Sequence, residues 1–298
     1  MYLPPFSYVV PQSLDEAITL LQDHLPEGKV LAGGQSLIPL MGLGLARPTA
    51  LIDLNGVRDL AGVSEVNGSL DIGALTRHRA LETSPLVRAR CPLLAEAASL
   101  IGNIRVRHRG TIGGSLAHAD PAAELPMVAA ALDAVIEIRG PNGAREVPAE
   151  RFFLGLLLTD LAPGEIVTSV KVPVLKPSSG YGLAELVRRA GDFAIVSACA
   201  VIERNPAGEC ARASLVLGGV GPHPRRIRPA EALLEGRPLT EDTLRRAADA
   251  VPSEVTPESD IHASADYRRA MSRVMAQRAL AAAAARADHP GGGGFHGN

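Results

Sequence analysis

The sequence predicts an α+β protein of two domains, on three observations. The chain has 298 residues, enough for roughly two domains that each bury a core. Its 46% hydrophobic and 21% charged residues are typical of a soluble globular protein. After a linker-like segment at 176–180, strand-length apolar runs precede helical patterns, the order of an α+β domain. We expect domains at 1–177 and 178–287 and a disordered, glycine-rich tail at 288–298.

The first half of the chain mixes strand and helix patterns. Residues 6–10 are predicted to form a strand, and Ser13 with Glu16 is a capping box that begins a helix. A second strand, 29–32, runs into a glycine turn. The pattern from 62 to 73, with an Asn-Gly turn, is typical of a hairpin. The other predicted elements here are a helix from Leu37, a strand at 50–54, a helix capped by Thr76, a short helix from Pro85 and a helix at 92–101.

The second half begins with a predicted buried helix at 124–132, a hairpin at 134–147 and a strand at 165–173. Three apolar strands and three helices then follow. They are expected at 182–188, 193–203, 211–217, 229–234, 240–251 and 265–286.

Composition argues against several functions. Only 3% of residues are aromatic, and 30 Lys and Arg balance 32 Asp and Glu, so neither nucleic acid nor an anionic membrane is an expected partner. Three cysteines without CxxC spacing cannot hold an iron–sulfur cluster alone and indicate a reducing compartment. Since we find neither a signal-peptide pattern nor an apolar run of ~20 residues, we expect a cytoplasmic protein without a membrane span.

Two glycine pairs are the main candidates for a binding site. The first, Gly33 and Gly34, follows a predicted strand, and the second, Gly113 and Gly114, lies between Thr111 and Ser115. Glycine allows backbone N–H groups to approach an anion closely. Two such loops could hold one diphosphate from both sides. The alternating Arg105, Arg107 and Arg109 would share a face of an extended segment and either touch phosphate or lie in solvent.

Other kinds of site are weakly supported. The dinucleotide fingerprint GxGxxG is missing, because Arg47 stands where the third glycine after Gly42 and Gly44 would be. Asp53 is interpreted as the end of a strand. His118 and Asp120 lack metal-ligand spacing, so no metal is expected. Neither a nucleophile motif nor paired catalytic carboxylates stand out, so we expect no catalytic side chain.

Taken together, these motifs resemble the FAD-binding medium subunit of the molybdenum hydroxylase family, which includes carbon monoxide dehydrogenase and xanthine dehydrogenase. The resemblance runs nearly end to end. It implies an N-terminal FAD-binding domain of the vanillyl-alcohol-oxidase (PCMH) type and a C-terminal antiparallel sheet with helices. The motifs that carry it are residues 31–41, 51–55, 72–74, 109–121, 163–165, 188–194 and 267–269.

The resemblance also implies which residues bind FAD. Ile101 would line the adenine or flavin pocket, Glu124 would stand where the family usually has an Asp near the ribityl chain, and Val167 would pack on the flavin ring. A lysine that the family often carries is missing, with Ala184 and Glu185 in its place. The diphosphate would be held by Ala32, Gly33, Gly34, Gln35, Ser36, Thr111, Ile112, Gly113, Gly114 and Ser115.

The implied function is electron transfer within a complex. Electrons would pass from a molybdopterin-binding large subunit through a [2Fe-2S] small subunit to FAD on this chain, and then to an external acceptor. Non-covalent FAD is expected because no His or Cys flanks either glycine pair. Two alternatives stay open: a stand-alone flavin oxidoreductase and a flavin-free scaffolding subunit. The sequence indicates neither the substrate nor whether the acceptor is NAD, quinone or oxygen.

Overall fold

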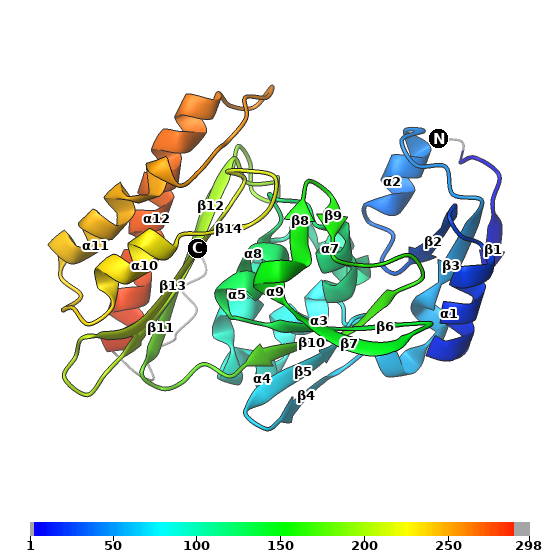
Figure 1. The fold of residues 1–298 in the computed structure, drawn as a ribbon, viewed down its shortest axis with the longest axis horizontal. Coiled ribbons are helices and arrows are strands. Elements are labelled where there is room, and N and C mark those ends of the chain that lie inside the picture. Colours follow the sequence, from blue (N-terminus) through cyan, green and yellow to red (C-terminus); the bar gives the residue numbers. More distant parts are fainter. Residues whose placement is uncertain (1–2, 289–298) are drawn as a thin grey trace.

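The computed structural model describes residues 3–288, which form three parts side by side along the long axis of the molecule (Figure 1). Each part has its own sheet and its own cluster of buried hydrophobic side chains. The N-terminal part lies at one end, the central part carries most of the short helices, and the C-terminal part lies at the other end. The predicted α+β class is confirmed.

The N-terminal part is a parallel sheet of three strands. Its order is β1 (Ser7–Val9), β3 (Ala50–Asp53) and β2 (Gly28–Leu31). Helix α1 (Leu14–Asp23) begins as predicted at Ser13, whose hydroxyl accepts the Glu16 N–H at 3.2 Å. Helix α2 (Leu37–Gly42) follows the glycine turn after β2. Asp53 ends its strand as predicted and accepts the Asn55 N–H at 2.9 Å.

The central part is an antiparallel sheet of five strands covered by short helices. The strand order is β4 (Val63–Val66), β5 (Ser69–Gly73), β10 (Ile166–Pro173), β6 (Val135–Gly140) and β7 (Gly143–Pro148). Both predicted hairpins, β4–β5 and β6–β7, are confirmed. The remaining elements are α3 (His78–Thr83), α4 (Pro85–Arg90), α5 (Pro92–Leu100), α6 (Ile104–Arg109), α7 (Ile112–His118), α8 (Glu124–Ala131), α9 (Ala149–Phe152), β8 (Phe153–Gly155) and β9 (Leu158–Thr159).

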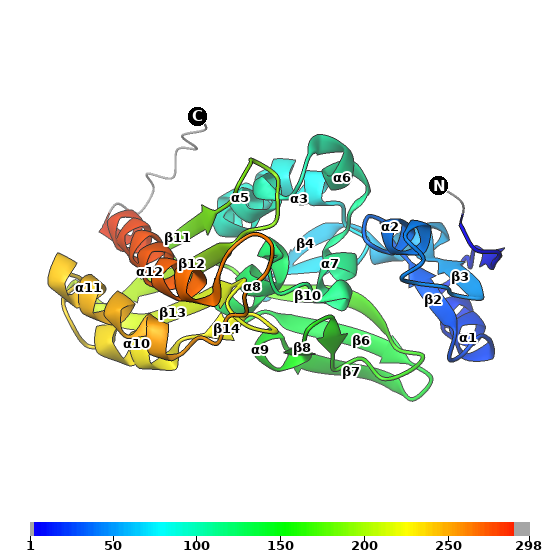
Figure 2. The ribbon, with the colours of Figure 1, turned by 90° about the horizontal axis from the view of Figure 1, so that it is seen from above.

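The C-terminal part is an antiparallel sheet between two helical layers. It contains β11 (Ser179–Leu186), β12 (Val196–Arg204), β13 (Cys210–Gly218) and β14 (Arg225–Arg226). Helices α10 (Arg228–Leu234), α11 (Glu241–Asp249) and α12 (Ala265–Asp288) cover its outer face, and α5 and α8 contact its inner face (Figures 1 and 2). Helix α12 lies very close to β11, because a Cβ on Gly182 would meet the Ala279 carbonyl oxygen at 2.0 Å.

Polar contacts join the central and C-terminal parts. The Gly219 N–H donates to the Pro121 carbonyl at 2.8 Å. The Arg226 side chain, only 5% exposed, pairs with Asp133 of the central part and with Glu231 of α10, the latter at 2.7 Å. A buried guanidinium with two carboxylate partners fixes the relative position of the two parts.

Three local predictions were wrong. The segment with Arg105 and Arg107 is helix α6, not an extended strand, because the Asn103 side chain accepts the Arg105 N–H at 2.9 Å and caps a helix. Thr76 does not cap α3, because its hydroxyl bonds both backbone groups of Gly62 at 2.9 Å. Asp288, expected in the tail, ends α12, and the rest of that tail lies outside the described residues.

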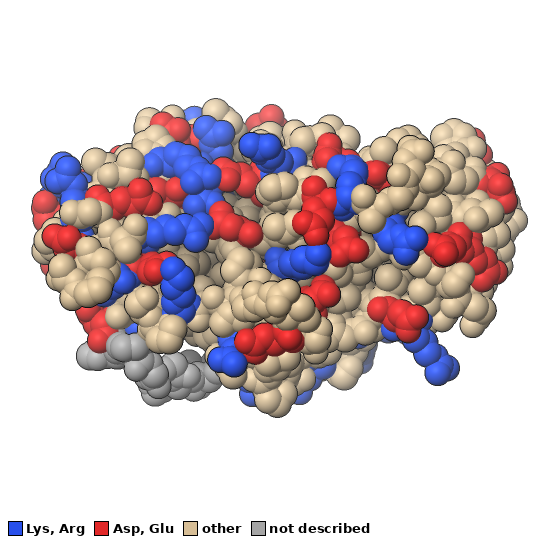
Figure 3. Space-filling model, turned by 60° about the horizontal axis from the view of Figure 1, so that its bottom comes forward, with Lys and Arg blue, Asp and Glu red and all other residues tan. Residues whose placement is uncertain are grey.

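The described surface mixes charges of both signs. Figure 3 shows Lys and Arg side chains interspersed with Asp and Glu over one face, in keeping with a net charge of −2. Among residues 3–288, no helix combines the length and apolar character needed to cross a membrane.

Candidate cofactor site

The structure brings the two glycine loops into contact. A Cβ on Gly33 would lie 2.4 Å from the Arg109 carbonyl oxygen and 2.8 Å from the Gly110 Cα, distances that no side chain tolerates. A Cβ on Gly114 would lie 3.7 Å from the Ala32 Cβ. Glycine at position 33 is therefore what allows the backbone of one loop to rest on the backbone that leads into the other.

The first loop, residues 32–36, presents backbone donors without partners. In the described part of the chain, the N–H groups of Gly33, Gly34, Gln35 and Ser36 have no protein acceptor. Gly34 has a φ of 71°, in the left-handed region, so the peptide groups around it can face a common side. Consecutive unpaired amides of this kind form a concave anion-binding nest. The predicted cradle fits a phosphate here.

The second loop, residues 111–115, uses its amides within the protein. Thr111 is 1% exposed, and its hydroxyl caps α7. The next four N–H groups are all hydrogen-bonded: Ile112 to Thr76 O at 3.1 Å, Gly113 to Ala74 O at 2.8 Å, Gly114 to Thr111 Oγ1 at 3.1 Å and Ser115 to Thr111 O at 3.0 Å. These bonds anchor the loop to the central sheet. Contrary to the prediction from the sequence, these amides are therefore not free to bind an anion.

A cavity of about 440 Å³ opens beside the first loop. Gly33, Gly34 and Gln35 line it together with Tyr8, Asp53 and Arg109. The Asp53 carboxylate is occupied, since it accepts hydrogen bonds from the Tyr8 hydroxyl and from Asn55. The hydrogen bond to Asp53 raises the pKa of Tyr8, so this phenol stays protonated. Arg109, which lines the same cavity, supplies positive charge beside the unpaired amides.

The three arginines of α6 have different surroundings. Arg107 pairs with Glu82 at 3.0 Å and donates to the Ile101 carbonyl at 3.0 Å, so it holds the end of α5. Arg105 is exposed. Only Arg109 lines the cavity beside the first loop. The helical twist of α6, absent from the sequence prediction, separates these roles.

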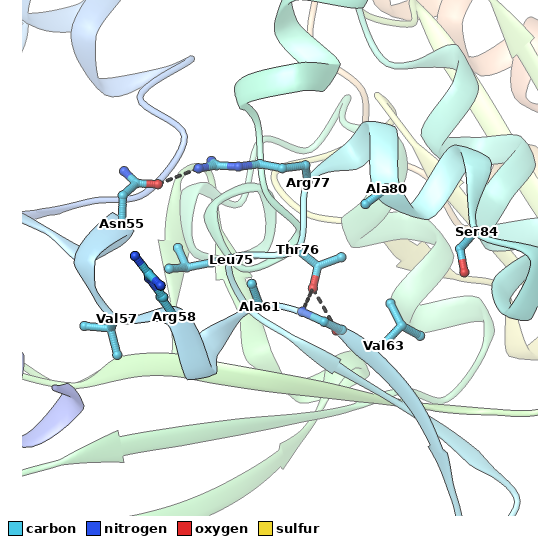
Figure 4. Close-up of a pocket in the computed structure, with 11 residues that line it drawn as sticks. Asn55, Val57, Arg58, Ala61, Val63, Leu75, Thr76, Arg77, Ala80 and Ser84 are labelled. Carbon is cyan, nitrogen blue, oxygen red and sulfur yellow. Dashed lines mark hydrogen bonds between the residues drawn. The ribbon is translucent and has the colours of Figure 1, made fainter. Parts of the chain in front are cut away.

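Asn55 and Arg77 form a polar clamp that contacts the first loop, and Figure 4 shows the hydrogen bond between them. Asn55 donates to the Ala32 carbonyl at 2.9 Å, and Arg77 donates both to Asn55 and to the Arg109 carbonyl. Arg77 therefore connects the two loops. Asn55 and Arg77, with Arg58, line a second cavity of about 470 Å³. No sequence pattern indicated this clamp, because its members are far apart along the chain.

A buried histidine lies beneath the second loop. His78 is 5% exposed, and its ring would be 2.7 Å from a Cβ on Gly110. Neither ring nitrogen has a hydrogen-bond partner among the described residues. Burial lowers the pKa of His78 to about 4, so the ring is neutral near pH 7.

The other predicted site residues lie further toward the C-terminal part. Ile101 is partly buried at the end of α5, where the neighbouring Gly102 contacts Gly191 of the β11–β12 loop. Glu124 is 7% exposed and begins α8. Val167 is 5% exposed and packs in the central core beside an irregularity in β10. Figures 1 and 2 show α2, α7 and α8 in succession along the long axis of the molecule.

Comparisons with known proteins identify the family of this chain. Residues 4–175 match the model of the FAD binding domain in molybdopterin dehydrogenase, and residues 182–283 match that of the CO dehydrogenase flavoprotein C-terminal domain. The chain is 40% identical to the 6-hydroxypseudooxynicotine dehydrogenase complex subunit alpha of Paenarthrobacter nicotinovorans, over 95% of this chain and 96% of that one.

Carbon monoxide dehydrogenase matches this chain both in sequence and in structure. The medium chain from Hydrogenophaga pseudoflava is 40% identical over 96% of this chain and 99% of its own length. A solved structure of that organism's enzyme superimposes with a TM-score of 0.94, covering 96% of this chain and 99% of that chain at 41% identity. The resemblance seen in the sequence is confirmed. This chain belongs to the family of FAD-binding medium subunits of the molybdenum hydroxylases, and it is an oxidoreductase subunit whose cofactor is FAD.

Proposed function

We propose that this chain is the electron-transfer subunit of its complex and that the first glycine loop holds the FAD diphosphate. The observation that carries the proposal is the set of unpaired N–H groups at residues 33–36. A diphosphate needs several donors that point at one place, and bare backbone amides supply them without side-chain reorganisation. Arg109, beside the same loop, would pair with the diphosphate charge.

The second loop has a supporting role in this proposal. Gly114 lies beside Ala32 of the first loop, and Thr111, Ile112 and Gly113 would hold it there. Ser115 has a hydroxyl not bonded to the described protein. Ile101 and Glu124 would contact the middle and flavin end of the cofactor. Val167 would form part of the shell beneath the flavin ring, since its side chain is almost fully buried.

The chemistry of the complex determines what this chain must do. FAD, when bound, can accept and release one or two electrons. The residues described here bind and orient it. We propose that the electrons come from a [2Fe-2S] small subunit, itself supplied by a molybdopterin-binding large subunit, and leave to an external acceptor. Support comes from relatives named as the subunit alpha of a dehydrogenase complex and as a medium chain.

Two further expectations remain part of the proposal. We place the division between the FAD-binding and C-terminal domains at residues 177 and 178, in the turn before β11. We also propose a cytoplasmic location, supported by Cys91, Cys199 and Cys210, which are free and buried.

The test is anaerobic reduction of the purified, FAD-loaded chain, followed by flavin absorbance. Substrates of molybdenum hydroxylases should leave the isolated chain oxidised, and addition of the iron–sulfur and molybdenum subunits should bring about bleaching. Rapid bleaching of the isolated chain by any such substrate would overturn the proposal and favour a stand-alone oxidoreductase. A chain that binds no FAD would favour the scaffolding alternative.

A further inference from the structure

The second cavity, of about 470 Å³, lies next to the Asn55–Arg77 clamp. It is lined by residues between 55 and 63, by the connection from β5 to α3, and by Ala80 and Ser84 (Figure 4). Among the described residues, none lines both this cavity and the one beside the first loop. The second cavity is therefore a separate space that the proposed FAD contacts do not use.

Hydrogen bonds hold the wall of this cavity in place. The Thr76 hydroxyl bonds both the N–H and the carbonyl of Gly62, each at 2.9 Å. The Leu75 N–H donates to the Leu60 carbonyl at 2.7 Å. A Cβ on Gly62 would meet no atom within 4 Å, so open space begins at this backbone. The cavity is thus already formed, and a ligand that enters it pays little for rearrangement of the protein.

The charged residues that line this cavity are both basic. They are Arg58 and Arg77, and no Asp or Glu from the described part of the chain lines it. Neither arginine forms an ion pair within residues 3–288, and the Arg58 side chain forms no hydrogen bond there either. Figure 4 shows both guanidinium groups at the end of the cavity where Asn55 lies. That end of the cavity carries positive charge that the described protein does not neutralise.

The clamp leaves Arg77 able to bind a ligand. Its hydrogen bonds to Asn55 and to the Arg109 carbonyl use only two of its N–H donors. Burial, followed by the charge of Arg109, lowers the pKa of Arg77, and Asp53 opposes this shift. An anion stabilises a partly buried guanidinium that lies near a like charge. The planar guanidinium group matches the oxygens of a carboxylate or a phosphate.

The rest of the cavity wall is largely apolar. Figure 4 shows Val63, Ala80 and Ser84 at the end away from the guanidinium groups. An apolar space of about 150 Å³ already holds a benzene ring, so this cavity has room for an aromatic or aliphatic body as well as a charged group. The other apolar side chains that line it are those of Val57, Ala61 and Leu75.

We propose that this cavity binds a small organic oxyanion, with its carboxylate or phosphate at Arg58 and Arg77 and its apolar body toward Val63 and Ala80. Arg77 also donates to the Arg109 carbonyl, on which the first loop rests, so the bound charge acts on the proposed diphosphate site. Two anions then draw on the same positive charges, and each weakens the binding of the other. This coupling rests on the proposed FAD site, whereas the oxyanion site itself does not.

The first experiment titrates the FAD-free full chain with benzoate, by calorimetry at constant ionic strength. Benzamide has the same ring without the charge and should bind at least about tenfold more weakly. Arg58→Gln removes one of the two guanidinium groups and should weaken benzoate binding about tenfold. Arg237→Gln, at an exposed position in the C-terminal part, is the matched control and should bind as wild type does. Equal binding of benzoate and benzamide, or unchanged binding in Arg58→Gln, would overturn the proposal.

A cavity-filling variant tests where the ligand lies. Ala80→Leu places a larger apolar side chain in the cavity, keeps a good helix former in α3 and changes no charge. It should weaken benzoate binding at least about tenfold while the thermal midpoint stays close to that of wild type. Benzoate binding that is unchanged in this variant would place the ligand elsewhere and overturn the site.

Phenyl phosphate and inorganic phosphate distinguish the possible ligands. Phenyl phosphate should bind as benzoate does or more tightly, and the tighter of the two identifies the preferred anionic group. Inorganic phosphate lacks the apolar body and should bind at least about tenfold more weakly than phenyl phosphate. If inorganic phosphate binds as tightly as phenyl phosphate, the apolar wall contributes nothing and the proposed ligand class is wrong.

The second experiment repeats the benzoate titration with the FAD-loaded chain. Benzoate should bind about three- to tenfold more weakly than in the FAD-free chain. Unchanged affinity would overturn the coupling through Arg77. Complete exclusion of benzoate by FAD would show that the cofactor itself fills the cavity, and would overturn a separate site. Failure of the chain to bind FAD would overturn the proposed cofactor site, while the titration of the FAD-free chain would still decide on the oxyanion site.

Discussion

The two glycine loops look alike in sequence but differ in what their amides do. In the first, the N–H groups of residues 33–36 have no protein acceptor in the described chain, whereas in the second every N–H from Ile112 to Ser115 is bonded within the protein. One loop is free to bind an anion, and the other is fixed to the central sheet. A glycine pair therefore permits close backbone approach, but the tertiary structure decides whether a ligand or the protein itself makes that approach.

The largest effect is predicted for a substitution that forces the two loops apart where they touch. In Gly33→Ala, the added Cβ would meet the Arg109 carbonyl oxygen at 2.4 Å, so the loops must move apart. FAD affinity should fall by more than about a hundredfold, roughly 3 kcal/mol. Equilibrium titration followed by flavin fluorescence measures this change.

Gly221→Ala is the control for Gly33→Ala, since its Cβ would have only Thr256 within 4 Å, at 3.8 Å. This variant should bind FAD as wild type does. If Gly33→Ala folds and binds with unchanged affinity, the contact between the loops is not needed and the comparison fails.

The sequence predicted the parts of this arrangement that depend on local chemistry. Glycine at 33 and 34 marked the first loop, the Asn67-Gly68 turn marked the β4–β5 hairpin, and Ser13 marked the start of α1. These features follow from neighbouring residues and therefore appear as patterns in the chain.

What the sequence did not reveal depends on distant partners. The acceptors that occupy the second loop are carbonyls of Ala74 and Thr76 on another segment. The packing of α8 against β12 and β13 likewise joins residues far apart in the chain. The helical form of α6 depends on the cap at Asn103, which the alternation of arginines concealed.

The next prediction concerns the loss of folding stability in acid and the residue beneath the second loop, His78. His78 is neutral in the folded chain, with a pKa of about 4 against an ordinary 6.5. The unfolded chain takes up a proton first, so stability from this group is present above pH 6.5 and is lost as the pH falls toward 4. Between pH 7 and pH 5 this loss should be about 2 kcal/mol.

His78→Gln cannot gain this charge, and urea unfolding should show a smaller loss of stability between pH 7 and pH 5 than wild type. The exposed His262→Gln should behave as wild type. A wild-type acid dependence in His78→Gln would show that the ring beneath the second loop is not the acid-sensitive group.

A smaller effect is expected from charge beside the first loop. Arg109→Gln removes the guanidinium that lines its cavity but leaves the Arg109 backbone on which Gly33 rests. FAD affinity should fall about tenfold, and the loss should shrink at high salt because screening weakens the charge interaction. Arg105→Gln, on the exposed side of the same helix, should change affinity little. Equal losses in both variants would indicate a general charge effect rather than a contact at the first loop.

The smallest predicted effect tests whether the second loop supports the site from inside the protein rather than contacting the cofactor. The Thr111 hydroxyl accepts the Gly114 N–H at 3.1 Å and caps α7, so Thr111→Val should cost about 1 kcal/mol of folding stability. Thr111→Ser keeps the hydroxyl and should retain most of that stability. Because the cap supports the loop from inside the protein, FAD affinity should change less than in Arg109→Gln. A Thr111→Val chain of normal stability that has lost FAD binding would reverse the assignment, since the second loop would then be the one that contacts the cofactor directly.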